Sequence, residues 1–300
     1  MPILVGDKTR VLVQGITGNT GRVATKIMLE YDTKVVAGVT PGKGGQEVEG
    51  VPVYDSVKEA VENHPEINLS AVFVPPSAAR ESIIEAVDNG IKLINCLTEG
   101  IAISDTAFAL KYAEMHGTRV VGPASIGIIS PEACRVGVVG GSKDIVERIY
   151  KKGFVGVISR SGGMTNETSW MIRQAGLGQS TAVGIGGDVL IGTDFADLLM
   201  LFEEDPQTKC VVIFSEPGGT YEDRIAECIR RGEYTKPLVA FIAGRFMENM
   251  PKGMKFGHAG TLIEGQRNTA SHKMSILQKA GVIVTENYEE IGDVVKTAIG

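Results

Sequence analysis

Long apolar runs are missing from this chain of 300 residues. A helix that spans a membrane needs about 18 or more consecutive apolar residues, and no such stretch occurs. The first residues also lack the extended apolar segment of a secretory signal peptide. We therefore predict a cytoplasmic protein that has no membrane partner.

Cysteines are few in this chain, and acidic residues outnumber basic ones. The four cysteines lie far apart and form no C-x-x-C pair: Cys96, Cys134, Cys210 and Cys228. Such spacing is typical of reduced, buried thiols rather than of a disulfide framework or a zinc site. The formal net charge is −6, whereas nucleic-acid-binding proteins usually carry a basic face. We expect no nucleic-acid partner and no metal site in this chain.

Glycine, by contrast, is abundant, and the 38 glycines cluster at the ends of apolar runs. Those runs favour β-strands and alternate with amphipathic helical patterns. The expected strands are 11–15, 34–40, 71–75, 92–97 and 119–122 in the first half, and 155–159, 181–185, 211–215, 238–243 and 282–285 in the second. Strands this apolar indicate parallel sheets that helices cover on both faces.

The alternation is interrupted once. Residues 126–152 contain frequent Gly, Pro and Ser, and we interpret them as a linker. The predicted fold class is α/β, with doubly wound parallel sheets in a first domain at residues 1–125 and a second domain at residues 153–300. Ligands of such sheets bind beyond the carboxyl ends of the strands, so we expect the chemistry in the loops that follow the strands.

The first of these loops is rich in glycine. Gly15-Ile16-Thr17-Gly18-Asn19-Thr20-Gly21 follows a strand and opens a helix, where free N–H groups and the helix dipole favour a phosphate. The spacing is not G-x-G-x-x-G, and the second strand ends in Val39-Thr40-Pro41 without an acid for a ribose hydroxyl. Both features argue against a NAD-dependent dehydrogenase.

A lysine lies beside this loop in Pro41-Gly42-Lys43-Gly44-Gly45. The segment is not a P-loop, because its spacing is short and Gly44 stands where a serine or threonine would be. Two loops are thus suited to bind phosphate, and no acidic residue is placed to bind a ribose hydroxyl. This combination favours a phosphorylated nucleotide such as CoA. The alternative is that these glycines only form tight turns.

His258 differs from the other three histidines, which lie at the ends or in the first turn of expected helices. Glycines flank it in Gly257-His258-Ala259-Gly260, so a bulky charged group could approach the ring. An imidazole is partly neutral near pH 7 and is therefore a suitable nucleophile for phosphoryl transfer. The alternative is a histidine that merely lies in a glycine turn.

A nucleophilic histidine needs an acceptor for its other ring nitrogen. Glu216, in Ser215-Glu216-Pro217-Gly218-Gly219, and Glu167 are the two candidates. The phosphate also needs a cradle, which Ser161-Gly162-Gly163 would supply at the start of a helix. A nucleophilic serine is the alternative for that segment, but no G-x-S-x-G motif is present.

These motifs, in this order, resemble those of the succinyl-CoA synthetase α subunit and of the matching part of ATP-citrate lyase. Three further segments carry the resemblance: Leu97-Thr98-Glu99-Gly100, Gly122-Pro123-Ala124 and Gly184-Ile185-Gly186-Gly187-Asp188. The similarity covers essentially the whole chain. It implies a Rossmann-like CoA-binding domain followed by a flavodoxin-like ligase domain. It also implies an acid–CoA ligase whose partner, an ATP-grasp β subunit, binds ATP or GTP with Mg²⁺, in an αβ pair or an (αβ)₂ assembly.

The resemblance also implies roles for individual residues. CoA would be held by Thr17, Gly18, Asn19, Thr20, Lys43, Leu97, Thr98 and Glu99. ATP would phosphorylate His258, which Glu216 would orient, and Ser161, Gly162 and Gly163 would hold the phosphate. The phosphate would then pass to a substrate carboxylate, and the CoA thiol would displace it to give a thioester. A CoA-sensing protein without catalysis is the rival binding function.

The substrate is predicted from two departures. Succinyl-CoA synthetases typically have G-P-N-x-P-G and S-G-T-L-T-Y-E, where this chain has G-P-A-S-I-G and S-G-G-M-T-N-E. The tyrosine associated with succinate is therefore Asn166 here, beside Glu167, and ATP-citrate lyase has the same asparagine. Because an amide can donate to citrate's extra groups, we predict citrate–CoA ligation that stops at citryl-CoA. Succinate–CoA ligation is the alternative.

Overall fold

The structure is a computed structural model that describes residues 3–250, 257–263 and 265–300. The first domain contains a sheet with the strand order β3-β4-β2-β1-β5-β6-β7. Its strands are β1 (Arg10–Gln14), β2 (Lys34–Val39), β3 (Glu47–Val48), β4 (Val51–Tyr54), β5 (Leu69–Val72), β6 (Leu93–Cys96) and β7 (Arg119–Val121). Its helices are α1 (Asn19–Glu30), α2 (Val57–Asn63), α3 (Pro76–Asp88) and α4 (Ile103–Met115). Six of these strands, in the order β4-β2-β1-β5-β6-β7, have the arrangement of a dinucleotide-binding fold.

Both faces of the first sheet are apolar, as the sequence predicts. Alternate residues of a strand point to opposite faces, and β1 shows the consequence. Val11 and Val13 pack in one core cluster with Met28 of α1, whereas Leu12 packs in the other cluster, with Ile83 of α3. Burial on both faces explains why β1 is a continuous apolar run.

The second domain contains a sheet with the order β14-β13-β12-β10-β11-β8-β9. Its strands are β8 (Gly127–Ser130), β9 (Cys134–Gly137), β10 (Lys152–Ser159), β11 (Gln179–Gly184), β12 (Cys210–Ser215), β13 (Leu238–Ile242) and β14 (Ile283–Val284). Its helices are α5 (Lys143–Ile149), α6 (Gly162–Gln174), α7 (Phe195–Glu204), α8 (Tyr221–Arg230), α9 (Ala270–Lys279) and α10 (Ile291–Ile299), with 3₁₀ turns η1 (Arg245–Asn249), η2 (Gln266–Asn268) and η3 (Tyr288–Glu290). The five parallel strands β10 to β14 have the flavodoxin-like order.

The structure corrects one expectation about this architecture and adds detail to another. Residues 126–152, predicted to be a linker, form β8, β9 and α5, and β8 pairs with β11 in antiparallel fashion. The strands β8, β9 and β3 also make the sheets mixed rather than purely parallel. The strands β8 and β9 are short and contain glycine. They therefore lack the long apolar pattern by which the other strands are predicted from the sequence.

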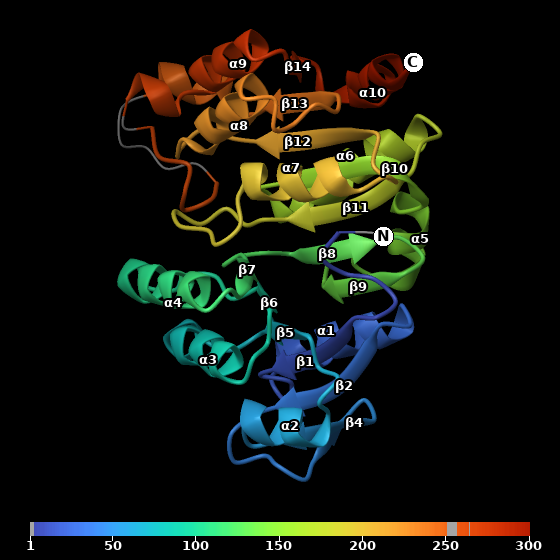
Figure 1. Cartoon of the computed structure of the whole chain (residues 1–300), viewed down its shortest axis with the longest axis vertical. Helices are drawn as coiled ribbons and strands as arrows, with labels where there is room; N and C mark the ends of the chain where they lie inside the picture. Colours follow the sequence, from blue (N-terminus) through green and yellow to red (C-terminus); the bar gives the residue numbers. More distant parts are fainter. Residues whose placement is uncertain (1–2, 251–256, 264) are drawn as a thin grey trace.

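The two domains meet where α1 ends. Figure 1 shows β8 and β9 (green) between the first domain at the bottom and the second domain at the top. The Thr33 hydroxyl donates to the Arg135 carbonyl at 2.7 Å and accepts from the Arg135 N–H at 3.0 Å. The N–H of Gly137 contacts the sulfur of Met28 at 3.4 Å. These buried contacts join the glycine-loop helix directly to the second sheet.

Within the described residues, no helix has the length and apolar character needed to cross a membrane.

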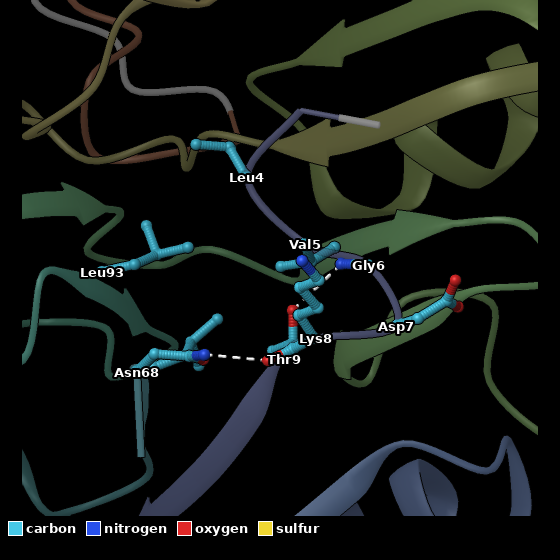
Figure 2. Close-up of a pocket in the computed structure, with 9 residues that line it drawn as sticks. Leu4, Val5, Gly6, Asp7, Lys8, Thr9, Asn68 and Leu93 are labelled. Atoms are coloured by element: carbon cyan, nitrogen blue, oxygen red, sulfur yellow. Dashed lines mark hydrogen bonds between the residues drawn. The ribbon is translucent and has the colours of Figure 1, made fainter. Parts of the chain in front are cut away.

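A cavity of about 380 Å³ lies where the chain enters the first domain (Figure 2). Thr9, Leu69 and Leu93 line it at the amino-terminal ends of β1, β5 and β6. It therefore lies at the edge of the sheet opposite to the predicted ligand loops.

Candidate active site

The predicted phosphate cradle lies at the start of α6, directly after β10. Ser161 is the N-cap residue, and its hydroxyl accepts from the N–H of Met164 at 3.4 Å. The Ser161 N–H itself donates to the Ser159 hydroxyl at 3.1 Å. Gly162 and Gly163 occupy the first helical positions, where N–H groups have no acceptor within the helix. This helix end is suited to hold an anion.

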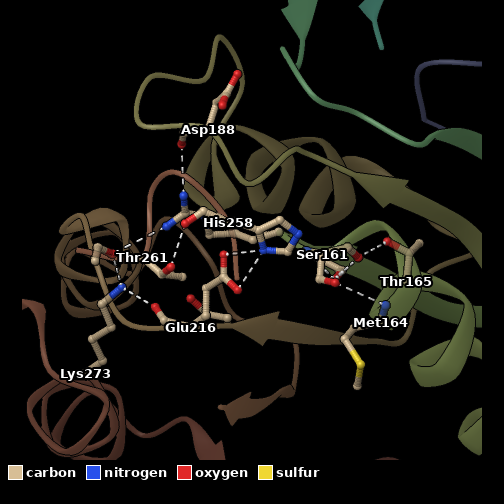
Figure 3. A network of polar contacts seen from close by, with 12 residues as sticks. Ser161, Met164, Thr165, Asp188, Glu216, His258, Thr261 and Lys273 are labelled. Atoms are coloured by element: carbon tan, nitrogen blue, oxygen red, sulfur yellow. Dashed lines mark hydrogen bonds and ion pairs between the residues drawn. The ribbon is translucent and has the colours of Figure 1, made fainter. Parts of the chain in front are cut away.

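His258 and Glu216 form the centre of the site, although 42 residues separate them in sequence. The imidazole Nδ1 lies 3.0 Å from each carboxylate oxygen of Glu216, which directly follows β12. In Figure 3 the other ring nitrogen points away from Glu216 and toward the Ser161 end of α6. With the Nδ1 proton assigned to this contact, Nε2 carries the lone pair that a nucleophile needs.

The electrostatics of the site act on the same imidazole. The hydrogen bond to Glu216 raises the pKa of His258 above its ordinary value of 6.5, although burial opposes the shift. The negative charge of Glu99 also raises the pKa, whereas the positive charge of Arg160 lowers it. Glu99 comes from the first domain, so its charge reaches the His258 ring from across the domain boundary.

Close backbone approach explains the glycines around His258. A Cβ added to Gly187 would lie 2.4 Å from Cγ of the His258 ring. A Cβ added to Gly218, in the loop of Glu216, would lie 1.9 Å from the Gly260 carbonyl oxygen. The N–H of Gly260 donates to the Gly187 carbonyl at 2.9 Å. Three loops therefore contact one another at distances that exclude side chains.

We predict that Gly187→Ala displaces the His258 ring and lowers the rate of its phosphorylation by about 10-fold to 100-fold, because small misplacements of reacting groups are costly. Gly265→Ala is the control, since an added Cβ there meets no heavy atom of the described residues within 4 Å. Labelling of both variants with radioactive nucleotide, in the presence of the partner subunit, measures the effect. Equal labelling of the two variants would contradict it.

Two buried cations beside the site escaped the sequence analysis. The Arg160 side chain donates to the carbonyl oxygens of Asp188 at 3.0 Å and of Gly218 at 3.4 Å. Lys273 lies on the buried face of α9, together with Ala270, Met274 and Leu277. That helical spacing was the available signal, since a lysine on an apolar stripe must find buried partners.

The predicted CoA residues lie in loops at one edge of the first sheet. Thr17 and its neighbours follow β1, Lys43 follows β2, and Leu97, Thr98 and Glu99 follow β6. The Thr17 hydroxyl bonds that of Thr40 at 3.2 Å, which ties the first two loops together. The Thr98 hydroxyl is buried and donates to the Val74 carbonyl at 2.8 Å. The proton of this hydroxyl is therefore engaged within the fold.

A cavity of about 280 Å³ connects the third of these loops to the His258 loop. The first domain contributes Gly100, Ile101, Ile103 and Thr106, and the second contributes Asp188, Val189, Leu190, Ala259 and Leu262. Burial and the charge of Glu99 raise the pKa of Asp188. The predicted CoA site and the predicted phosphohistidine site are therefore adjacent.

The structure does not bring Asn166 and Glu167 to the His258–Glu216 pair through any hydrogen bond of the described residues. The Asn166 amide oxygen accepts from the Gly140 N–H and the Tyr150 hydroxyl, each at 2.9 Å. Glu167 is exposed beside Trp170 in a surface pocket between α5 and α6. Of the two candidate orienting acids, the structure therefore places Glu216, and not Glu167, against the histidine.

Comparisons with known proteins agree with this arrangement. Residues 6–100 match the CoA binding domain family, and residues 158–283 match the CoA-ligase family. The α subunit 2 of an ADP-forming succinate–CoA ligase from Archaeoglobus fulgidus is 47% identical over 295 residues, which is 98% of this chain and 99% of that one. A subunit of an ADP-forming sulfoacetate-CoA ligase from Acholeplasma sp is 44% identical over 97% of this chain and 96% of its own length.

Among solved structures, a mutant ATP citrate lyase of Methanosaeta concilii in complex with (3S)-citryl-CoA matches 99% of this chain, with a TM-score of 0.92 and 26% identity. This chain spans 50% of that lyase chain. Fold and site together define a CoA ligase subunit with a CoA-binding domain and a ligase domain. The chain belongs to the family of succinate–CoA ligase α subunits.

Proposed function

We propose that this chain is the α subunit of a nucleotide-dependent carboxylate–CoA ligase that works through a phosphohistidine at His258. The observation that carries the proposal is the contact of Nδ1 with both oxygens of Glu216 at 3.0 Å. This contact leaves Nε2 facing the helix end at Ser161 (Figure 3). A nucleophile, its orienting acid and an anion cradle thus occupy one site.

The chemistry would proceed in three transfers. Nε2 attacks the γ-phosphorus of ATP, and ADP leaves with the electrons of the broken P–O bond. A substrate carboxylate oxygen then attacks the phosphorus, the N–P bond breaks, and its electrons return to Nε2. Finally the CoA thiol, having lost its proton, attacks the acyl carbon and expels phosphate. The acyl phosphate is needed because a free carboxylate has no adequate leaving group.

As the resemblance implies, the nucleotide and its Mg²⁺ would bind to a partner of ATP-grasp type, the β subunit. The relatives named above form ADP, which favours ATP over GTP as the phosphoryl donor. The active unit would be an αβ pair or an (αβ)₂ assembly.

The comparisons favour succinate rather than the citrate predicted from the motifs. Succinate–CoA ligase α subunits match at 45% to 47% identity, whereas the citrate lyase matches at 26%. The contacts of Asn166 do not decide between the two acids, because Gly140 and Tyr150 occupy its amide oxygen, whereas the citrate argument depends on its N–H donors. Citrate remains the second candidate, since the lyase covers 99% of this chain at a TM-score of 0.92.

We expect the reconstituted αβ pair to show a higher kcat/KM for succinate than for citrate. The two acids, together with sulfoacetate and acetate, should be compared at saturating ATP and CoA, with thioester formation as the readout. Formation of citryl-CoA at the higher kcat/KM would reverse this assignment. Thioester formation from none of the acids would refute the ligase proposal for these substrates.

Lys43 is expected to bind a phosphate of CoA through a charge-assisted contact, which is worth about 1.5–3 kcal/mol. We therefore predict that Lys43→Ala weakens CoA binding by about 10-fold to 100-fold. Lys34→Ala is the matched control, because Lys34 is exposed at the amino-terminal end of β2, the strand that precedes Lys43. Calorimetric titration of the full chain with CoA measures both affinities. Equal affinities would remove Lys43 from the site.

A further inference from the structure

A buried lysine donates hydrogen bonds to the backbone of the loop that carries Glu216. The Lys273 ammonium donates to the carbonyl oxygens of Glu216 at 2.8 Å and of Gly218 at 2.6 Å. Its third contact is an ion pair with Glu222, at 2.8 Å between Nζ and Oε2. The side chains of Lys273 and Glu222 are 1% and 0% exposed. Figure 3 shows Lys273 on the side of the Glu216 loop away from His258.

The counter-ion is itself held in place by the strand that precedes the loop. The hydroxyl of Ser215, the last residue of β12, donates to Oε1 of Glu222, in the first turn of α8. Strand β12, the loop after it, α8 and α9 therefore meet at one ammonium group. An ammonium has three N–H donors, and here two serve the loop carbonyls while the charge is balanced by Glu222.

We propose that Lys273 is a positioning residue for the phosphohistidine, because it sets the backbone from which Glu216 reaches His258. This inference rests on the function proposed above. Gly218 is also held by Asn268 and Arg160, whereas among the described residues the donor to the Glu216 carbonyl is Lys273. Without the lysine, the Glu216 carbonyl would lose its buried donor, and the carboxylate would no longer be held 3.0 Å from Nδ1.

A purely structural role is the alternative, and it predicts a different pattern of effects. If Lys273 only stabilised the fold, its loss would lower the free energy of unfolding without changing the environment of His258. If it positions Glu216, its loss also lowers the pKa of His258, because the hydrogen bond to Glu216 is the main cause that raises it. The other charged groups that act on the His258 ring are Arg160, Glu99 and Asp188.

The test uses the double variant Lys273→Met with Glu222→Gln. Removing one partner of a buried ion pair leaves an uncompensated charge and can unfold the protein, whereas neutral replacement of both partners is often tolerated. Glutamine can still accept from Ser215, and methionine has a volume similar to that of lysine. The double variant therefore removes the donors to the loop while it retains packing.

The matched control is Lys236→Met. Lys236 also donates to two backbone carbonyl oxygens, those of Phe202 and Asp205, each at 2.6 Å. It lies just before β13, at the end of the strand that is opposite to the His258 loop. Its loss should cost stability through the same kind of contact without changing the site.

Two readouts are measured on the full chain. In the presence of the β subunit and labelled ATP, we expect the double variant to be phosphorylated about 10-fold to 100-fold more slowly than the wild type, and Lys236→Met to stay within about twofold. In the absence of nucleotide, histidine nitrogen NMR should show a lower pKa for His258 in the double variant than in the wild type and the control.

The outcomes separate the two proposals. An unchanged His258 pKa and an unchanged phosphorylation rate in the folded double variant would overturn the role of Lys273. Loss of phosphorylation with an unchanged pKa would also overturn it, because the Glu216 contact would then be intact. If the wild type itself is never phosphorylated, the proposed function fails, while the NMR titration still decides whether Lys273 positions Glu216.

Discussion

Replacing His258 by asparagine is expected to abolish phosphorylation of this chain, with a loss of about a thousandfold or more, because the amide of asparagine has no nucleophilic nitrogen lone pair. The ring has its Nδ1 bound by Glu216 and its Nε2 directed at the start of α6. Incubation with the β subunit and radiolabelled ATP should give the wild type an acid-labile, base-stable label.

The control for this result is His116→Asn, which changes an exposed histidine at the carboxyl end of α4 in the first domain. It should be labelled as strongly as the wild type. Retention of an equal label on His258→Asn would show that the phosphoryl group is carried elsewhere, and the central assignment would be wrong.

Glu216→Gln is expected to have the second-largest effect, a loss of about 10²-fold to 10⁴-fold in phosphorylation, by analogy with other acids that orient a catalytic histidine. The hydrogen bond to Glu216 is the first cause of the raised pKa of His258. The wild-type rate should therefore rise with pH through a pKa above 6.5 as Nε2 loses its proton. In the variant, burial and Arg160 remain as causes that lower this pKa, so the rise should occur at lower pH.

The raised pKa of His258 also makes stability depend on pH, but in the opposite direction to the phosphorylation rate. Because the folded-state pKa of His258 lies above 6.5, the contact with Glu216 contributes stability that is fully present below pH 6.5 and is lost as pH rises through the folded-state pKa. The stability difference between wild type and Glu216→Gln should therefore shrink at high pH. Chemical denaturation across that range measures it, with Glu204→Gln, an exposed acid of α7, as the control. A difference that grows with pH would contradict this account.

The sequence identified most elements of the site, because each has a local signature. Glycine loops after apolar strands marked the ends of β1, β10 and β12, and the glycines beside His258 marked the proposed nucleophile. Close approach explains Gly187, Gly218 and Gly260, whereas a Cβ added to Gly257 would meet no heavy atom of the described residues within 4 Å. Gly187 and Gly218 leave no space for a Cβ. The need for close backbone packing at the site can therefore be recognised from single glycines in the sequence.

The choice between Glu216 and Glu167 was not accessible to local patterns. Both acids follow a strand of the second sheet, and both lie near glycines. Only the strand order brings β12 next to β10, and with it the Glu216 loop to the cradle and to His258. Glu167 is turned outward because it lies on the exposed face of α6. Pairing over 42 residues is a property of the topology.

By itself, then, the sequence determined the alternation of strands and helices and the two glycine-rich loops, and it singled out the proposed nucleophile, since these depend on residues that are neighbours in the chain. The tertiary structure decided that residues 126–152 join the second sheet, that the Glu216 carboxylate contacts His258, and that Lys273 is buried beside the Glu216 loop. The physical reason is that a buried charge or an edge strand finds its partners through packing, and these partners lie far away along the chain.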